Sequence, residues 1–295
     1  MNHIQTTLAL VALLGMPTAA LADCPADQDS NGSVDGLDLG IVLGAWGSSG
    51  PMGDVDSSGL VDILDLLGVL NGWGDCPADA FVCGDFLVDT RDGQSYATVG
   101  IGLHCWMADN LNYGAFTAST RPGSVAADDG IAQRTCYDND PANCALYGGL
   151  YEWDEVMNFA ASSNSDPSGV QGICPDGWEV PSDAAYQDLE RSLGMAPWEV
   201  DLLDDWRGAP VGARIKDGGG SGFDGLLSGW RDFETGTFND IGFYGGLWTS
   251  RASTEDPTES YNRGLLAPWD TVGRYRYDAR AGLGLRCVEV GLVND

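Results

Sequence analysis

An internal repeat near the N-terminus restricts the local fold more than any other feature of the sequence. Residues 27–47, DQDSNGSVDGLDLGIVLGAWG, align without gaps on residues 54–74, DVDSSGLVDILDLLGVLNGWG. In each copy, acidic residues at alternate positions surround a glycine, Gly32 or Gly59, and an apolar stretch follows. Oxygen side chains at every second position of a tightly turned loop form the ligand pattern of a calcium-binding loop. The repeat therefore predicts two such loops.

Each loop offers oxygen atoms at positions 1, 3, 5, 7, 9 and 12 of a twelve-residue segment. The first predicted ligand set is Asp27, Asp29, Asn31, the carbonyl of Ser33, Asp35 (directly or through water) and Asp38. The second set is Asp54, Asp56, Ser58, the carbonyl of Leu60, Asp62 and Asp65. Because calcium takes six to eight oxygen ligands, we expect two calcium ions. Ser58 is a poorer ligand than Asn31, so the second site is expected to be the weaker one.

An apolar pattern with helical spacing follows each loop. Leu39, Val42, Leu43 and Trp46 follow the first loop, and Leu66, Val69, Leu70 and Trp73 follow the second. The spacing i, i+3, i+4, i+7 predicts one short helix after each loop, with this face buried. Position 12 is Asp instead of the Glu of ordinary EF-hands, and no helical pattern precedes either loop. With these two differences, the segment resembles a dockerin.

The dockerin resemblance implies a partner, either a cohesin-like protein or another surface protein in an extracellular assembly. Loop positions 10 and 11 carry Gly36-Leu37 and Ile63-Leu64 instead of the Ser/Thr pairs of clostridial cellulosomal dockerins. The alternative is a calcium module with a purely structural role. Cys24 and Cys76 bracket the segment, and we expect them to form a disulfide.

Several features predict export to an extracellular or cell-surface location. Residues 8–22 are apolar and end in Ala20-Leu21-Ala22, which predicts a signal peptide over residues 1–22. The run is short and contains Gly15 and Pro17, which disfavours a membrane span. All eight cysteines follow it, an even number that favours disulfides. The net charge of −30 disfavours nucleic acid and anionic membranes, and suits cation binding or a saline habitat.

The composition changes near Ala80, which predicts a boundary between a module at 23–80 and a domain at 81–295. The first segment has eleven Asp and no Lys or Arg. The second is rich in glycine and aromatic residues. Strands are expected at 96–108, 246–253 and 283–290, and helices at 150–162 and from Ser182 onward. This mixture predicts an α+β domain.

Five ordered motifs of the larger domain carry a second resemblance. They are CGDFLVDTRDGQSYATVGIGLHCWMADNLNYG, CYDNDPANCALYGGLYEWDEVMN, GICPDGWEVPSDAAYQDLE, SGFDGLLSGWRDFETGTFNDIGFYGGLWTS and YRYDARAGLGLRCVEV. In this order they resemble the Fibrobacter succinogenes major paralogous domain, which is similar in layout to C-type-lectin-like domains. The expected fold class is thus a small all-α calcium-loop module (dockerin/EF-hand-like) followed by a larger α+β, disulfide-supported, C-type-lectin-like domain.

The cysteine pattern fits this resemblance. It implies the pairs Cys83–Cys105, Cys136–Cys144 and Cys174–Cys287, although eight cysteines allow 105 arrangements. The C-terminal domain shows no recognisable catalytic set. His104 adjoins a half-cystine in a predicted strand, which favours a structural role, and Glu152, Asp154 and Glu155 suit the polar face of a helix.

Aromatic side chains gather between residues 230 and 248, with carboxamide and carboxylate groups among them. The candidate ligand-binding residues are Trp230, Phe238, Asn239, Asp240, Tyr244 and Trp248. They suit a polysaccharide or a protein ligand, while a packed core is the alternative. The sequence therefore favours a secreted, non-enzymatic protein that attaches through the calcium module and binds an extracellular ligand. The competing functions are a dockerin-bearing carbohydrate-active enzyme of the glycoside hydrolase type and a structural surface protein.

Overall fold

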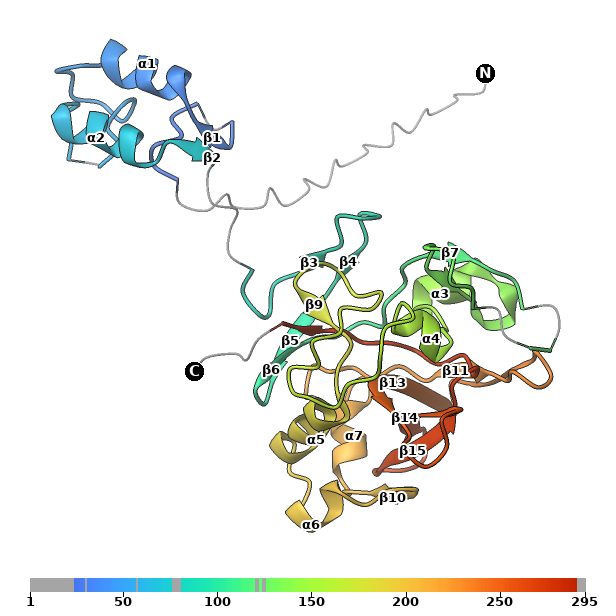
Figure 1. The fold of residues 1–295 in the computed structure, drawn as a ribbon. Coiled ribbons are helices and arrows are strands. Elements are labelled where there is room, and N and C mark those ends of the chain that lie inside the picture. The colour runs from blue at the N-terminus through green and yellow to red at the C-terminus, as the bar shows by residue number, and fades with distance from the viewer. Residues whose placement is uncertain are drawn as a thin grey trace, which may run out of the picture. The chain divides into compact units, whose positions relative to one another are not determined.

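The structure, a computed structural model, describes residues 24–29, 31–56, 58–75, 81–119, 122–123 and 126–290 (Figure 1). This part of the chain forms two compact units that separate between Phe81 and Val82. The predicted signal peptide at 1–22 and Cys76 lie outside the described residues. Cys24, the partner predicted for Cys76, is disulfide-bonded.

The N-terminal unit contains two helices and one small sheet. Helix α1 (Gly36–Gly44) follows the first loop and α2 (Ile63–Asn71) follows the second. Strand β1 (Ser33–Val34) pairs antiparallel with β2 (Gly74–Asp75). This sheet joins segments far apart in the sequence, and such pairing cannot be read from local periodicity. The expectation of an all-α module is therefore wrong.

Both helices start at an aspartate of the loop that precedes them. The side chain of Asp35 accepts a hydrogen bond from the N–H of Leu37, and Asp38 accepts one from the N–H of Asp35. Asp62 and Asp65 form the same capping box at the start of α2. Because such a box satisfies N–H groups that lack helical partners, the loop sequence itself fixes where each helix begins.

The core of the N-terminal unit is small and consists mainly of valines. Val34, Val42, Val61 and Val69 are fully buried, and Leu39 and Leu66 pack against them. The rest of the predicted apolar face is not buried: Leu43, Trp46, Leu70 and Trp73 are each about half exposed. Helices α1 and α2 end before the two tryptophans, so these side chains do not continue the buried stripe.

The C-terminal unit is built on a six-stranded sheet with the order β10-β15-β14-β13-β11-β12. Its neighbours are antiparallel except for β11 and β13, which pair in parallel. The strands are β10 (Asp205–Arg207), β11 (Ser228–Arg231), β12 (Phe238–Ile241), β13 (Tyr244–Ala252), β14 (Glu259–Leu266) and β15 (Val272–Asp278).

A second sheet has four strands in the order β5-β6-β16-β9, and two small sheets pair β3 with β4 and β7 with β8. The strands of these sheets are β3 (Leu87–Val88), β4 (Ser95–Tyr96), β5 (Thr98–Ile101), β6 (His104–Met107), β7 (Ala115–Phe116), β8 (Gln133–Arg134), β9 (Trp178–Glu179) and β16 (Val288–Glu289). The strand predicted at 283–290 thus includes only one short element, and residues 283 and 284 form isolated bridges.

The helices of this unit are short. They are the 3-10 helix η1 (Tyr137–Asn139), α3 (Pro141–Tyr147), α4 (Trp153–Val156), α5 (Asp183–Ser192), α6 (Pro197–Val200) and α7 (Val211–Ile215). The helix predicted from Ser182 is confirmed, because the Ser182 hydroxyl caps α5. The helix predicted at 150–162 is only α4: Tyr151 bridges to Leu283, and Asn158 has a positive φ.

Strands, not helices, thus organise the described chain, and the expected fold class of an all-α module plus an α+β, C-type-lectin-like domain is wrong. The disulfides expected for the C-terminal domain are present. Cys83–Cys105, Cys136–Cys144 and Cys174–Cys287 are bonded, the same pairs named from the sequence. Such bridges indicate an oxidising environment. Among the described helices, none is long and apolar enough to span a bilayer.

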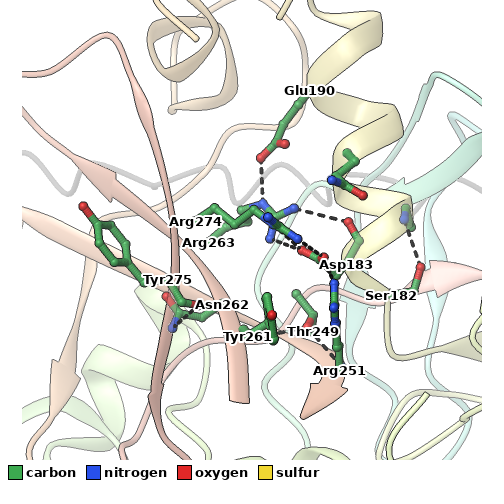
Figure 2. A network of polar contacts seen from close by, with 12 residues as sticks. Ser182, Asp183, Glu190, Thr249, Arg251, Tyr261, Asn262, Arg263, Arg274 and Tyr275 are labelled. Carbon is green, nitrogen blue, oxygen red and sulfur yellow. Dashed lines mark hydrogen bonds and ion pairs between the residues drawn. The ribbon is translucent and has the colours of Figure 1, made fainter. Parts of the chain in front are cut away.

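Helices α5 and α7 cover one face of the six-stranded sheet (Figure 1). Their contact buries Leu189, Val211 and Leu247 together with an ionic network. Figure 2 shows the network, in which Arg251, Arg263 and Arg274 converge on Asp183 at the start of α5. Glu190, two turns later in α5, binds Arg263 and Arg207. These contacts fix the helix on the sheet and leave the opposite sheet face available.

Candidate functional site

Three aspartates of the first loop lie close together. One carboxylate oxygen from each of Asp27, Asp29 and Asp38 lies within 4.8 Å of the others, and we call this set the first Asp cluster. They occupy loop positions 1, 3 and 12. Asp38 is buried, Asp27 is half-buried and Asp29 is exposed, so the cluster opens to solvent on one side.

Backbone hydrogen bonds hold the buried member of the cluster. Asp38 accepts the N–H groups of Gln28, Asp29 and Asp35 at 2.7, 3.1 and 2.8 Å. Burial acts to raise the pKa of Asp38, but these N–H groups outweigh it and lower the pKa. Loss of hydration and the negative charges of Asp38 and Asp27 raise the pKa of Asp29. The loop therefore holds negative charges near one another, an arrangement that a cation relieves.

The second loop repeats this arrangement. Asp54, Asp56 and Asp65 form the second Asp cluster, with one oxygen of each within 4.8 Å of the others and the same burial pattern. Asp65 accepts the N–H groups of Val55, Asp56 and Asp62 at 2.7, 3.2 and 2.7 Å. The geometry of the first loop is thus reproduced with equivalent residues.

The remaining predicted ligands lie around the clusters. Asp35 and Asp62 cap their helices and are not members of the clusters. The Asn31 amide oxygen accepts the N–H of Ser33 at 2.9 Å. At the equivalent place, the Ser58 hydroxyl donates to the carbonyl of Leu60 at 3.2 Å. The shorter Ser58 side chain therefore differs from Asn31 in the contact it makes.

The clusters fit a hard divalent cation. Two ligands on opposite sides of an ion with bonds of about 2.4 Å are about 4.8 Å apart, and the oxygens of both clusters lie within this distance of one another. Their side-chain donors are oxygens, whereas zinc sites usually include nitrogen or sulfur. Asp27, Asp29 and Asp38 can hold one ion, and Asp54, Asp56 and Asp65 a second.

Three of the predicted ligand-binding residues of the C-terminal unit lie together. Trp230, Asp240 and Tyr244 line a cleft of about 370 Å³, called here the aromatic cleft. The other three do not line it. Trp248 is fully buried and donates its indole N–H to the carbonyl of Tyr151, and Phe238 packs against Tyr137. Asn239 pairs with Trp230 through the strand backbone.

Most of the residues that line the cleft were not predicted from the sequence. Its further lining includes Trp206, Asn262, Tyr275 and Tyr277. The alternation of Tyr275 and Tyr277 in β15 placed both rings on one face, a signal present in the sequence as YRYD. Trp206 comes from β10, and only the pairing of β10 with β15 brings it beside them.

The other candidates have structural surroundings. His104 is buried in β6, with Nε2 3.2 Å from the carboxylate of Asp166. Glu152 and Glu155 are buried, contrary to the polar face expected for them. Glu152 pairs with Arg231, and Glu155 accepts the N–H groups of Ala127 and Gln133. Burial raises the pKa of Glu155.

Comparison with known proteins identifies the family to which the C-terminal unit belongs. No curated protein and no solved structure matches the chain. A family model, the Fibrobacter succinogenes major domain, matches residues 99–289, which extend from β5 to β16. The match includes the six-stranded sheet, helix α5 and the aromatic cleft. The chain therefore belongs to the Fibrobacter succinogenes major domain family.

Proposed function

We propose that the protein is a secreted, non-enzymatic calcium-binding protein that attaches to a partner through its N-terminal unit and binds an extracellular ligand through its C-terminal unit. The observation that carries the proposal is the pair of Asp clusters, each with three carboxylate oxygens within 4.8 Å. Two copies with equivalent ligands are expected of a functional site retained after duplication.

Calcium is the cation that the loops suit best. Carboxylates, backbone carbonyls and a solvent-open side match its requirement for six to eight oxygens in flexible geometry. Magnesium prefers a rigid octahedron with several waters retained. In the first loop Asn31 and the carbonyl of Ser33 would complete the ligand set, and in the second Ser58 and the carbonyl of Leu60.

The exposed apolar residues of the N-terminal unit support attachment to a protein partner. Leu37 and Leu64 occupy equivalent positions in the two repeats and are 65% and 56% exposed. Trp46 and Trp73, also equivalent, are 49% and 53% exposed. The same apolar positions are exposed in both repeats, which supports an interaction surface. A partner of the cohesin type or another surface protein fits this surface.

Calcium titration of the full secreted chain tests the first half of the proposal. We expect two binding events by isothermal titration calorimetry, one lost in Asp38→Asn and the other in Asp65→Asn. Asp217→Asn, an exposed aspartate of the C-terminal unit, is the matched control and keeps both. A wild-type protein that binds no calcium at millimolar concentration contradicts the proposal.

Attachment is tested with the immobilised chain and the extracellular fraction of the producing organism. We expect a partner that binds in calcium, elutes with chelator, and is not retained by a Leu37→Asp/Leu64→Asp variant that still binds calcium. If the pure protein instead hydrolyses a polysaccharide, and one carboxylate substitution abolishes this, the enzymatic alternative holds. Retention of no partner under either condition favours a structural role.

A further inference from the structure

The six-stranded sheet has one face covered by helices and one face that bears aromatic rings. Along β14 and β15, Arg263 and Arg274 point toward α5, while Asn262 and Tyr275 point to the other side (Figure 2). Side chains alternate in a strand, so Tyr277 lies on the same face as Tyr275. Trp206, paired with Gly273, joins them from β10.

Glycines make room for the rings on this face. Gly264 and Gly273 are direct partners across β14 and β15. A Cβ atom at Gly264 would lie 3.2 Å from ring atoms of both Trp206 and Tyr244, and one at Gly273 would lie 2.8 Å from the ring of Tyr275. The aromatic rings therefore pack directly against the backbone of these two glycines.

The aromatic cleft also contains polar atoms suited to a ligand. Asp240 accepts a hydrogen bond from the indole N–H of Trp230 at 3.0 Å, which orients this ring at the rim. Asn262 is 1% exposed, and its Oδ1 has no hydrogen-bond partner in the described part of the chain. An unpaired buried amide oxygen is costly, and a hydroxyl group entering the cleft can satisfy it.

We propose that the aromatic cleft binds a pyranose unit of a neutral extracellular polysaccharide. The apolar C–H face of a pyranose matches the electron-rich faces of Trp206, Trp230 and Tyr275. Its hydroxyl groups match Asp240 and the free oxygen of Asn262. The volume of about 370 Å³ accommodates a sugar ring but not a folded partner. This inference deepens, and rests on, the ligand-binding half of the proposed function.

Charge selects neutral sugars over acidic ones. The chain carries a net charge of −30, and Asp240 places a carboxylate in the cleft itself. Arg276 also lines the cleft, but its guanidinium is ion-paired with Asp204 and Glu255. A polyanion such as alginate is therefore repelled. The phenol groups of Tyr275 and Tyr277 are protonated at neutral pH, as for any tyrosine, and can donate hydrogen bonds to sugar oxygens.

The test is affinity gel electrophoresis of the full chain in mixed-linkage β-glucan, xylan, galactomannan and alginate, followed by calorimetry with the retarding polymer. We expect retardation by at least one neutral polymer and none by alginate. Trp230→Ala and Tyr277→Ala should each weaken binding at least tenfold. Trp198→Ala is the matched control, because Trp198 is 78% exposed on α6 and does not line the cleft.

The results of these assays distinguish a wrong cleft assignment from a wrong ligand class. If a neutral polymer binds wild type and both cleft variants equally, the cleft assignment is wrong while ligand binding stands. If no glycan on an array binds but a protein ligand does, the sugar class is wrong. A cooperative urea unfolding transition of the C-terminal unit, retained in each variant, shows that this unit is folded, so loss of binding reports on the cleft.

Discussion

The guanidinium of Arg263 and the carboxylate of Asp183 form an ion pair with both side chains buried, at 2.7 Å from Nη1 to Oδ1. Asp183 also accepts hydrogen bonds from Arg251 and Arg274, and Arg263 also binds Glu190 (Figure 2). One carboxylate thus compensates several cations between α5 and the sheet. Its removal leaves the buried guanidinium groups of Arg263 and Arg274 without this compensating charge.

Asp183→Asn should therefore destabilise the C-terminal unit strongly. Breaking a buried ion pair from one side costs about 3–5 kcal/mol, because the remaining charges are left uncompensated. Urea unfolding followed by tryptophan fluorescence measures the change. Asp217→Asn, with the same chemical substitution at an exposed site, should change the free energy of unfolding by less than about 0.5 kcal/mol. A loss below 1 kcal/mol in Asp183→Asn contradicts the role given to this carboxylate.

The same network predicts a loss of stability in acid. Burial acts to raise the pKa of Asp183, but Arg263 and Arg274 outweigh it and hold the pKa well below its usual range. The unfolded carboxyl, with a pKa of about 4, then takes up a proton more readily than the folded one. The stabilisation is fully present above about pH 4 and declines as the pH falls below it. Thermal unfolding between pH 7 and pH 2 measures this decline, and Asp183→Asn should show a flatter profile.

The two acidic loops were the most predictable part of the chain. Their ligand spacing and their duplication are local properties, and Asp38 and Asp65 carry both the metal pattern and the capping of α1 and α2. Strand β2 was not predictable in the same way. It exists because Gly74 and Asp75 meet Val34 and Ser33, a pairing between distant segments.

The aromatic cleft was predicted only in part, for a related reason. Trp230 and Tyr244 stand close in sequence and were found together, whereas Trp206 and Tyr275 reach them only through the order of strands in the sheet. Trp248 lies in the same aromatic-rich stretch of sequence as Trp230, and yet its side chain is fully buried. A single sequence does not reveal which sheet face an aromatic side chain occupies when both faces are largely apolar.

Ser58→Asn should strengthen the proposed second calcium site. Asn31 presents an amide oxygen at this loop position, whereas the Ser58 hydroxyl is shorter and donates to the carbonyl of Leu60. An added carbonyl-type oxygen should raise the affinity of the second site severalfold, since affinity follows the quality of the ligand set. The reciprocal variant Asn31→Ser should weaken the first site. Calorimetric titration measures the affinity of each site in the two variants. Unchanged affinities in both would mean that the side chain at loop position 5 does not contact the ion.

Removal of the Cys174–Cys287 bridge should cost more stability than removal of Cys136–Cys144. The first closes a sequence separation of 113 residues and the second one of 8. In the chain-entropy model the losses are about 4–5 and about 2–3 kcal/mol. The double variants Cys174→Ala/Cys287→Ala and Cys136→Ala/Cys144→Ala are compared by urea unfolding. The reverse order of stabilities would show that the long bridge does not restrict the unfolded chain as the model requires.

Gly264→Ala should damage the aromatic cleft while leaving the rest of the C-terminal unit folded. Its Cβ would meet the rings of Trp206 and Tyr244 at 3.2 Å, so both rings must shift away from the sheet. We expect a destabilisation of about 1–3 kcal/mol, typical of overpacking, and an altered tryptophan emission. Gly100→Ala in β5 is the matched control, since its Cβ meets only the sulfur of Cys83 at 3.7 Å. Polysaccharide binding should fall in Gly264→Ala and persist in Gly100→Ala. Equal binding by the two variants would show that the ligand does not depend on the position of the Trp206 and Tyr244 rings over Gly264.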